Sequence, residues 1–94
     1  MVSSRAVTQS VQPDPDVVGN RVGDEVVLVQ LRTSRIYSLN RTAARLWELL
    51  SDGRAPSEIE EQLVREFDVE QGEVAQEVDE VLAKLREAEL IQNA

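Results

Sequence analysis

The pattern of apolar and polar residues divides the chain into a β-rich part followed by three helical stretches. Two runs rich in β-branched residues, Val17–Val22 and Val26–Leu31, flank a Gly-Asp turn, and a short polar link separates the second run from a third, Arg35–Leu39. Runs of this kind around short turns are typical of hairpins. The sequence therefore predicts a three-stranded antiparallel meander.

The middle run carries apolar residues on both faces. One face holds Val26 and Leu28, and the other holds Val27, Val29 and Leu31. A strand covered on both faces lies in the centre of its sheet. The third strand, Arg35–Leu39, is then expected at an edge, where the backbone groups of its outer side lack a partner within the meander.

Apolar residues at three- and four-residue spacing predict helices over 41–50, 58–66 and 70–88. Asn40 is expected to cap the first helix, and Trp47 to anchor it in the core. Ser57 and Glu60 fit a capping box for the second helix, and Asp68 is expected to cap the third. The third helix has the longest apolar stripe: Val74, Val78, Val81, Leu82 and Leu85. Leu90 and Ile91, in the tail, are expected to pack back onto the core.

The first 16 residues are polar and contain Pro13 and Pro15, so we expect an extended or flexible arm with a weak strand near Val7–Val11. One compact domain is expected over 17–94. The N-terminus lacks the apolar core of a signal peptide, and no apolar run has the length of a membrane span. We therefore expect a cytoplasmic protein without a membrane partner.

Composition excludes much catalytic chemistry. The chain has no Cys and no His, which removes disulfides, thiolate nucleophiles, His-dependent triads and Cys/His metal sites. No Gly-rich phosphate loop appears, and the paired acids are typical of solvated helix faces. We therefore expect no enzymatic activity, no catalytic residues, no metal and no cofactor. A small hydrolase stays as a weak alternative.

The net charge of −8 is unevenly distributed. Residues 1–50 carry six Arg against five acids, whereas residues 51–94 carry four bases against thirteen acids. An acidic surface disfavours binding to nucleic acid, which requires Lys and Arg near phosphates. It suits a partner with basic residues, and Asp79 with its acidic neighbours is the candidate for steering one. Solvation of a helix face is the simpler interpretation.

The expected fold class is α+β and winged-helix-like, with the meander followed by three helices. A free edge strand beside a helix forms a groove that accepts an extended peptide as a fourth strand. Two other occupants of the edge remain open: the N-terminal arm and a second copy of the chain. The same helix count also permits a winged-helix transcriptional regulator that binds DNA, which the acidic third helix argues against.

The order of these motifs resembles the PqqD-like family of leader-peptide recognition elements. The resemblance covers residues 17–92 and is carried by "VVLVQL", "RTSR", "IYSLN", the helix with "LW" and the closing "VLAKLREAELI". One position departs from the family pattern: Glu89 stands where the family usually has Gly, which puts the turn after the third helix in question.

The resemblance implies that the leader of a ribosomally made precursor peptide adds as a strand to Arg35, Ile36, Tyr37, Ser38 and Leu39. The helix positions expected to face this strand are Val74, Val78, Leu82 and Leu85. A free-standing chain of this size is similar to the leader-binding partners of lasso-peptide biosynthesis, which hand the precursor to a separate leader peptidase or modifying enzyme. Arg35 is expected to pair with a carboxylate of the leader.

Overall fold

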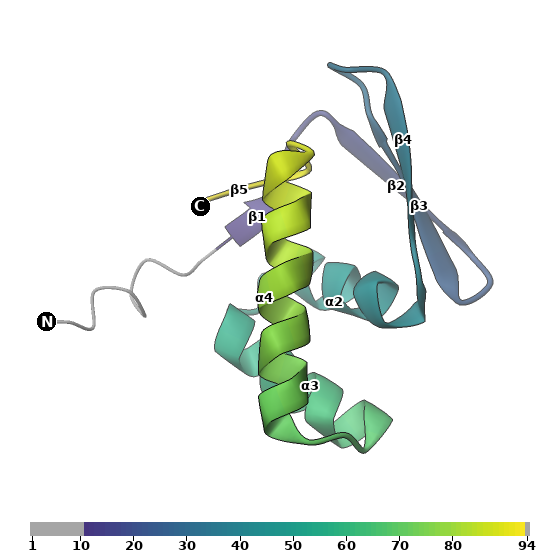
Figure 1. The fold of residues 1–94 in the computed structure, drawn as a ribbon. Coiled ribbons are helices and arrows are strands. Elements are labelled where there is room, and N and C mark those ends of the chain that lie inside the picture. Colours follow the sequence, from purple (N-terminus) through teal and green to yellow (C-terminus); the bar gives the residue numbers. More distant parts are fainter. Residues whose placement is uncertain (1–10, 94) are drawn as a thin grey trace, which may run out of the picture.

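The structure, a computed structural model, describes residues 11–93. Along the chain the elements are β1 (Val11–Pro13), β2 (Val17–Val22), β3 (Glu25–Gln30), β4 (Arg35–Leu39), α2 (Arg41–Ser51), α3 (Pro56–Phe67), α4 (Gln71–Glu87) and β5 (Ile91–Asn93). The sheet of β2, β3 and β4 stands on one side of α4, while α2 and α3 lie behind and below it (Figure 1). The predicted α+β class and the predicted three-stranded meander followed by three helices are confirmed, and the strand β5 was not predicted.

The three-stranded sheet has the order β2-β3-β4 and is antiparallel throughout. Its inner face carries Val26 and Leu28 of β3, both buried against the helices. Val27 and Val29 on the outer face are partly covered. The prediction for Leu31 was wrong, because β3 ends at Gln30 and Leu31 is an exposed residue of the following turn.

The first helix begins as expected. Asn40 lies outside α2 with an extended backbone, and its side-chain oxygen accepts a hydrogen bond of 3.0 Å from Ala43 N. Trp47, as predicted, is buried in the core. A Cβ at Gly19 of β2 would lie 3.1 Å from Leu28 and 3.5 Å from the Trp47 ring nitrogen, so this glycine lets the strand approach the ring.

The predicted caps of the other two helices were wrong. Ala55 is the N-cap of α3, and its backbone N–H donates to Glu58 Oε1 at 3.0 Å, so the helix begins two residues before the predicted start. Asp68 does not start α4. It ends α3 in a left-handed conformation with φ 53°, which Asp tolerates better than most residues, and Glu70 is the N-cap of α4.

A second, two-stranded sheet joins the two ends of the described chain. Val11 pairs with Asn93, and Pro13 with Ile91, in an antiparallel arrangement on the side of α4 that faces away from the larger sheet (Figure 1). Leu90 and Ile91 are buried, which confirms that the tail packs back. The predicted strand near Val7–Val11 lies outside the described residues except for Val11, which opens β1.

None of the helices in residues 11–93 combines the length and the apolar character needed to cross a bilayer. Within the same residues, no group of His, Cys, Asp or Glu side chains is arranged to hold a metal ion.

Candidate functional site: the groove between β4 and α4

The outer edge of β4 is open within residues 11–93, because β4 pairs with β3 alone. The register shows which backbone groups face this edge. Leu31 N donates to Asp16 O at 2.9 Å and thereby extends the β2–β3 ladder by one residue. In an antiparallel ladder, successive residues direct their backbone groups to opposite sides. Since Leu31 faces β2, its neighbour Gln30 faces β4.

Because the direction of the backbone groups alternates along β3, the same assignment can be made for β4. Gln30, Leu28 and Val26 direct their backbone groups to β4, where their partners are Arg35, Tyr37 and Leu39. The two residues between these partners, Ile36 and Ser38, therefore direct their N–H and C=O groups to the open edge. They offer two donors and two acceptors to an added strand.

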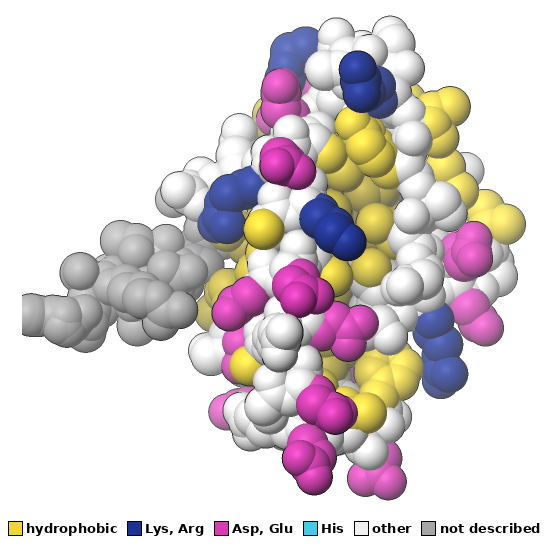
Figure 2. Space-filling view, viewed as in Figure 1, with side chains coloured by type: hydrophobic (Ala, Val, Ile, Leu, Met, Phe, Trp, Pro, Cys, Tyr) yellow, Lys and Arg dark blue, Asp and Glu magenta, His cyan; other side chains and the backbone are white. Residues whose placement is uncertain are grey.

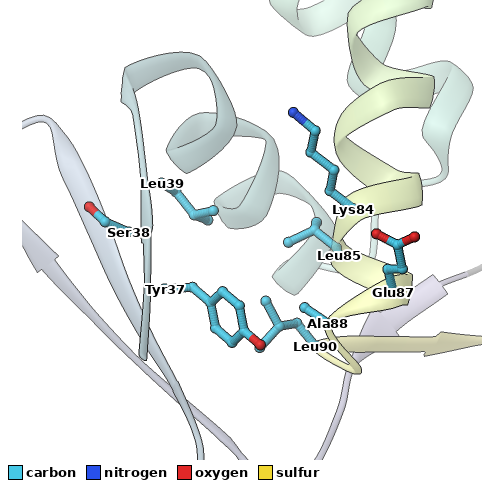
Figure 3. A pocket seen from close by; sticks show the side chains of 8 residues that line it. All are labelled: Tyr37, Ser38, Leu39, Lys84, Leu85, Glu87, Ala88 and Leu90. Carbon is cyan, nitrogen blue, oxygen red and sulfur yellow. The ribbon is translucent and has the colours of Figure 1, made fainter. Parts of the chain in front are cut away.

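The side chains of β4 alternate between the face toward α4 and the outer face of the sheet. Tyr37 is half-buried and Leu39 is buried, and both point toward α4 (Figure 3). Ser38 points the other way, and Ile36 is 70 % exposed on the outer face. An added strand would thus have its inward side chains next to Tyr37 and Leu39, facing α4.

A hollow of about 460 Å³ lies between β4 and the end of α4. Its walls are Tyr37, Ser38 and Leu39 on β4, and Lys84, Leu85, Glu87, Ala88 and Leu90 on the opposite side. The side chains of Tyr37, Leu39, Leu85 and Leu90 converge on it (Figure 3). This volume is in the range of pockets that bind ligands.

A second hollow of about 190 Å³ continues the first along the helix. It adds Asn40 and Ala43 on one side, and Glu77 and Val81 on the other, and it shares Ser38, Leu39, Lys84 and Leu85 with the first. Together the two hollows form one groove, which we call the β4–α4 groove. Figure 2 shows it as a depression lined by hydrophobic side chains between α4 and the sheet.

The structure places the predicted site residues in different surroundings. Arg35–Leu39 form β4 as expected, and Leu85 lines the groove. Val74, Val78 and Leu82 were predicted to face the added strand, but neither hollow of the groove includes them. They are buried in the core, and Val78 is only 1 % exposed.

Asp79 lies outside the groove as well. It is exposed on α4 two residues before Val81, so at 3.6 residues per turn it points about 160° away from Val81 around the helix. The groove side of α4 and its C-cap consists instead of Glu77, Val81, Lys84, Leu85, Glu87 and Ala88. Of these, sequence reasoning proposed only Leu85 as a binding residue. Lys84 and Ala88 lie at the border of the apolar stripe. A polar residue such as Lys84 at that border could have indicated the groove side of the helix.

An ion-pair cluster is centred on the turn between β3 and β4. Arg32, in the turn between β3 and β4, pairs with Asp16 at 2.7 Å, with Glu89 at 3.1 Å and with Asp14 at 3.3 Å. It thereby joins three segments: the link before β2, the β3–β4 turn and the turn after α4. Asp14 is almost fully buried. The N–H of Asp16, together with Arg32, holds the pKa of Asp14 below its usual value.

The turn after α4 keeps the form that a glycine would favour. Glu89 has φ 62°, and the helix ends in a Schellman motif in which Leu90 N donates to Leu85 O and Glu89 N donates to Arg86 O. The buried Gln30 side chain donates to Glu89 O at 2.6 Å. These contacts compensate for the left-handed conformation, so the turn still delivers Leu90 to the groove.

A second ion-pair cluster joins α2 to α3 away from the groove. Arg45 donates from two nitrogens to the two carboxylate oxygens of Glu66, each at 2.8 Å, and also pairs with Glu48. This pairing lowers the pKa of Glu66 to about 2. The cluster stabilises the contact between the two helices and contributes no side chain to the groove.

Comparison with known proteins identifies the family. The model of the family described as coenzyme PQQ synthesis protein D (PqqD) matches residues 25–91. A solved structure of TbiB1 in complex with the TbiA(β) leader peptide is 31 % identical, with a TM-score of 0.84, covering 86 % of this chain and 94 % of that chain.

A second solved structure, a lasso peptide synthetase B1 complexed with the leader peptide, shares the fold at 23 % identity and a TM-score of 0.81, covering 88 % of this chain and 98 % of that one. No curated protein gives a significant match. The family model matches well over half of the chain, and TbiB1 matches along nearly its whole length. The chain therefore belongs to the PqqD family.

Proposed function

We propose that this chain is a leader-binding protein without catalytic activity of its own. It captures the leader region of a ribosomally made precursor peptide as an antiparallel strand on β4, with the leader's inward side chains in the β4–α4 groove. It then hands the precursor to a separate leader peptidase or modifying enzyme, and the pathway is lasso-peptide biosynthesis.

One observation carries this proposal: the backbone groups of Ile36 and Ser38 face an open edge that borders an apolar groove. Backbone hydrogen bonds along such an edge bind any extended peptide, and pockets for alternate side chains give selectivity. The two solved relatives are complexes with leader peptides, which supports the same use of the site here.

Apolar contact supplies most of the affinity in this arrangement. A leader side chain gains about 25 cal/mol for each Å² of apolar surface that it buries, whereas one backbone hydrogen bond contributes about 1 kcal/mol net. Leu85, Ala88 and Leu90 on one side and Tyr37 on the other offer that surface. A regulator that binds DNA is disfavoured, because the exposed first half of α4 is acidic (Figure 2).

Hydrogen exchange of single amides tests the proposal. A library of random 16-residue peptides is displayed and selected on the protein, and an enriched peptide is synthesised and added at saturation. The amides of Ile36 and Ser38 should gain protection, while those of Tyr37 and Leu39, already bonded to β3, should change little. Protection confined to another surface, or a library without enrichment, would refute the proposal.

A further inference from the structure

The basic side chains of residues 11–93 fall into two groups. Arg21, Arg32 and Arg45 form ion pairs, Arg41 lies 5.0 Å from the centroid of the Phe67 ring, and Arg65 and Arg86 donate to side-chain amide oxygens. Within the same residues, the side chains of Arg35, Arg54 and Lys84 have neither an ion pair nor a hydrogen bond.

One of these three cations, Lys84, belongs to the walls of the β4–α4 groove, and Arg35 lies on β4 beyond the lining of either hollow. Arg35 begins β4, and Lys84 lies on α4, where it borders both hollows. Figure 3 shows the Lys84 side chain extending from the helix at the mouth of the groove, above the apolar side chain of Leu85. Arg54 is in the turn between α2 and α3 and is no part of the groove.

The acids near Lys84 form no ion pair with it in residues 11–93. Glu77 and Glu87 also border the groove, and Glu80 precedes Lys84 by one helical turn. All three acids are exposed, and none is joined to Lys84 by an ion pair. An ammonium group beside an apolar wall, with no partner in the described chain, favours a carboxylate on whatever occupies the groove.

We propose that Lys84 selects an acidic side chain in the bound peptide. This inference rests on the proposed function and adds a specificity to it. β4 runs from the end of α4 toward its middle, since Tyr37 borders Ala88 whereas Asn40 borders Glu77. An antiparallel peptide therefore starts at the acidic Glu77 end and finishes near Arg35. The acidic residue of the peptide is expected next to the peptide side chains that fill the apolar part of the groove, or closer to the C-terminal end of the bound segment.

The first test is a comparison of selections. The same random 16-residue library is selected on the parent protein, on Lys84→Glu and on Arg54→Glu. The Arg54 variant is the matched control, because it reverses the charge of an unpaired cation away from the groove. Asp or Glu should be enriched at one position of the peptides selected on the parent and on the control. Lys or Arg should replace it on Lys84→Glu.

A double-mutant cycle then measures the pairing. One peptide selected on the parent is made with its Glu or Asp replaced by Gln or Asn. This change should weaken binding to the parent about two- to fivefold and leave binding to Lys84→Ala unchanged. Equal losses in both proteins, or parent-selected peptides without an enriched acid, overturn the inference. The amides of Ile36 and Ser38 separate this failure from that of the proposed function, because they would still gain protection if only the charge selectivity were wrong.

Discussion

Replacing Ser38 by Pro tests the backbone hydrogen bonds of the β4 edge separately from the side chains of the groove. The N–H of Ser38 faces the open edge and takes no part in the β3–β4 ladder, and its side chain points away from the groove. Pro is tolerated on an edge strand where the lost N–H faces outward. We therefore expect Ser38→Pro to fold, with a far-UV circular dichroism spectrum and a urea midpoint close to those of the parent.

Binding should fall for two reasons. The donor of one hydrogen bond is gone, which costs about 0.5–1.5 kcal/mol, and the peptide carbonyl that it served is left unpaired at the edge, which brings the loss to about 1–3 kcal/mol. This corresponds to a dissociation constant roughly five- to 150-fold higher. Isothermal titration calorimetry with a peptide selected on the parent gives the value.

Ser38→Ala is the matched control. It keeps the N–H and removes only the hydroxyl, whose single described contact is a 3.4 Å hydrogen bond to Glu25. Its affinity should equal that of the parent. Tyr37→Pro provides the opposite case, because it removes an N–H that faces β3 and should weaken the fold itself. A folded Ser38→Pro protein that binds as tightly as Ser38→Ala would refute the assignment of the edge.

Three further predictions concern the helix wall, the turn after α4 and acid stability. Val81→Asp should keep the fold and weaken peptide binding at least tenfold by placing a charge in the groove, whereas Val78→Asp should unfold the protein, as circular dichroism would show. Glu89→Gly should be about 1 kcal/mol more stable to urea than Glu89→Ala, because both lose the ion pair but only Gly is at ease at φ 62°; equal stability would contradict this. The depressed pKa of Glu66 means that its pairing with Arg45 contributes stability above pH 4.5 that is lost as the pH falls toward about 2, so the unfolding free energy of Glu66→Gln should fall less over this range than that of the parent.

The sequence was most informative where the physical signal is local. The bounds of β4 were predicted correctly, because a turn with polar residues precedes Arg35 and a strong N-cap, Asn40, follows Leu39. The capping residues of α3 and α4 were missed because they depend on backbone contacts and backbone conformation. A backbone N–H at Ala55 serves the capping box there, and Asp68 adopts a left-handed conformation, and neither is readable from residue type.

The helix wall of the groove was harder to predict because α4 has two apolar neighbours. Its strongest stripe, with Val78 at the centre, is buried against α2 and α3. The groove uses the border of that stripe, where Val81 is half-buried and Lys84 is exposed. Periodicity identifies the most buried face of a helix, and a binding surface that must remain accessible lies beside that face.

The pairing of β1 with β5 has a consequence for how this domain can be joined to another protein. Since Val11 lies opposite Asn93, the polypeptide enters and leaves the described domain at one place. That place is on the side of α4 away from the sheet (Figure 1), so α4 stands between the start of such a linker and the open edge of β4. Adjacent entry and exit points are the geometry that tolerates insertion into another protein and circular permutation. We therefore expect that fusion at either strand leaves the open edge of β4 accessible.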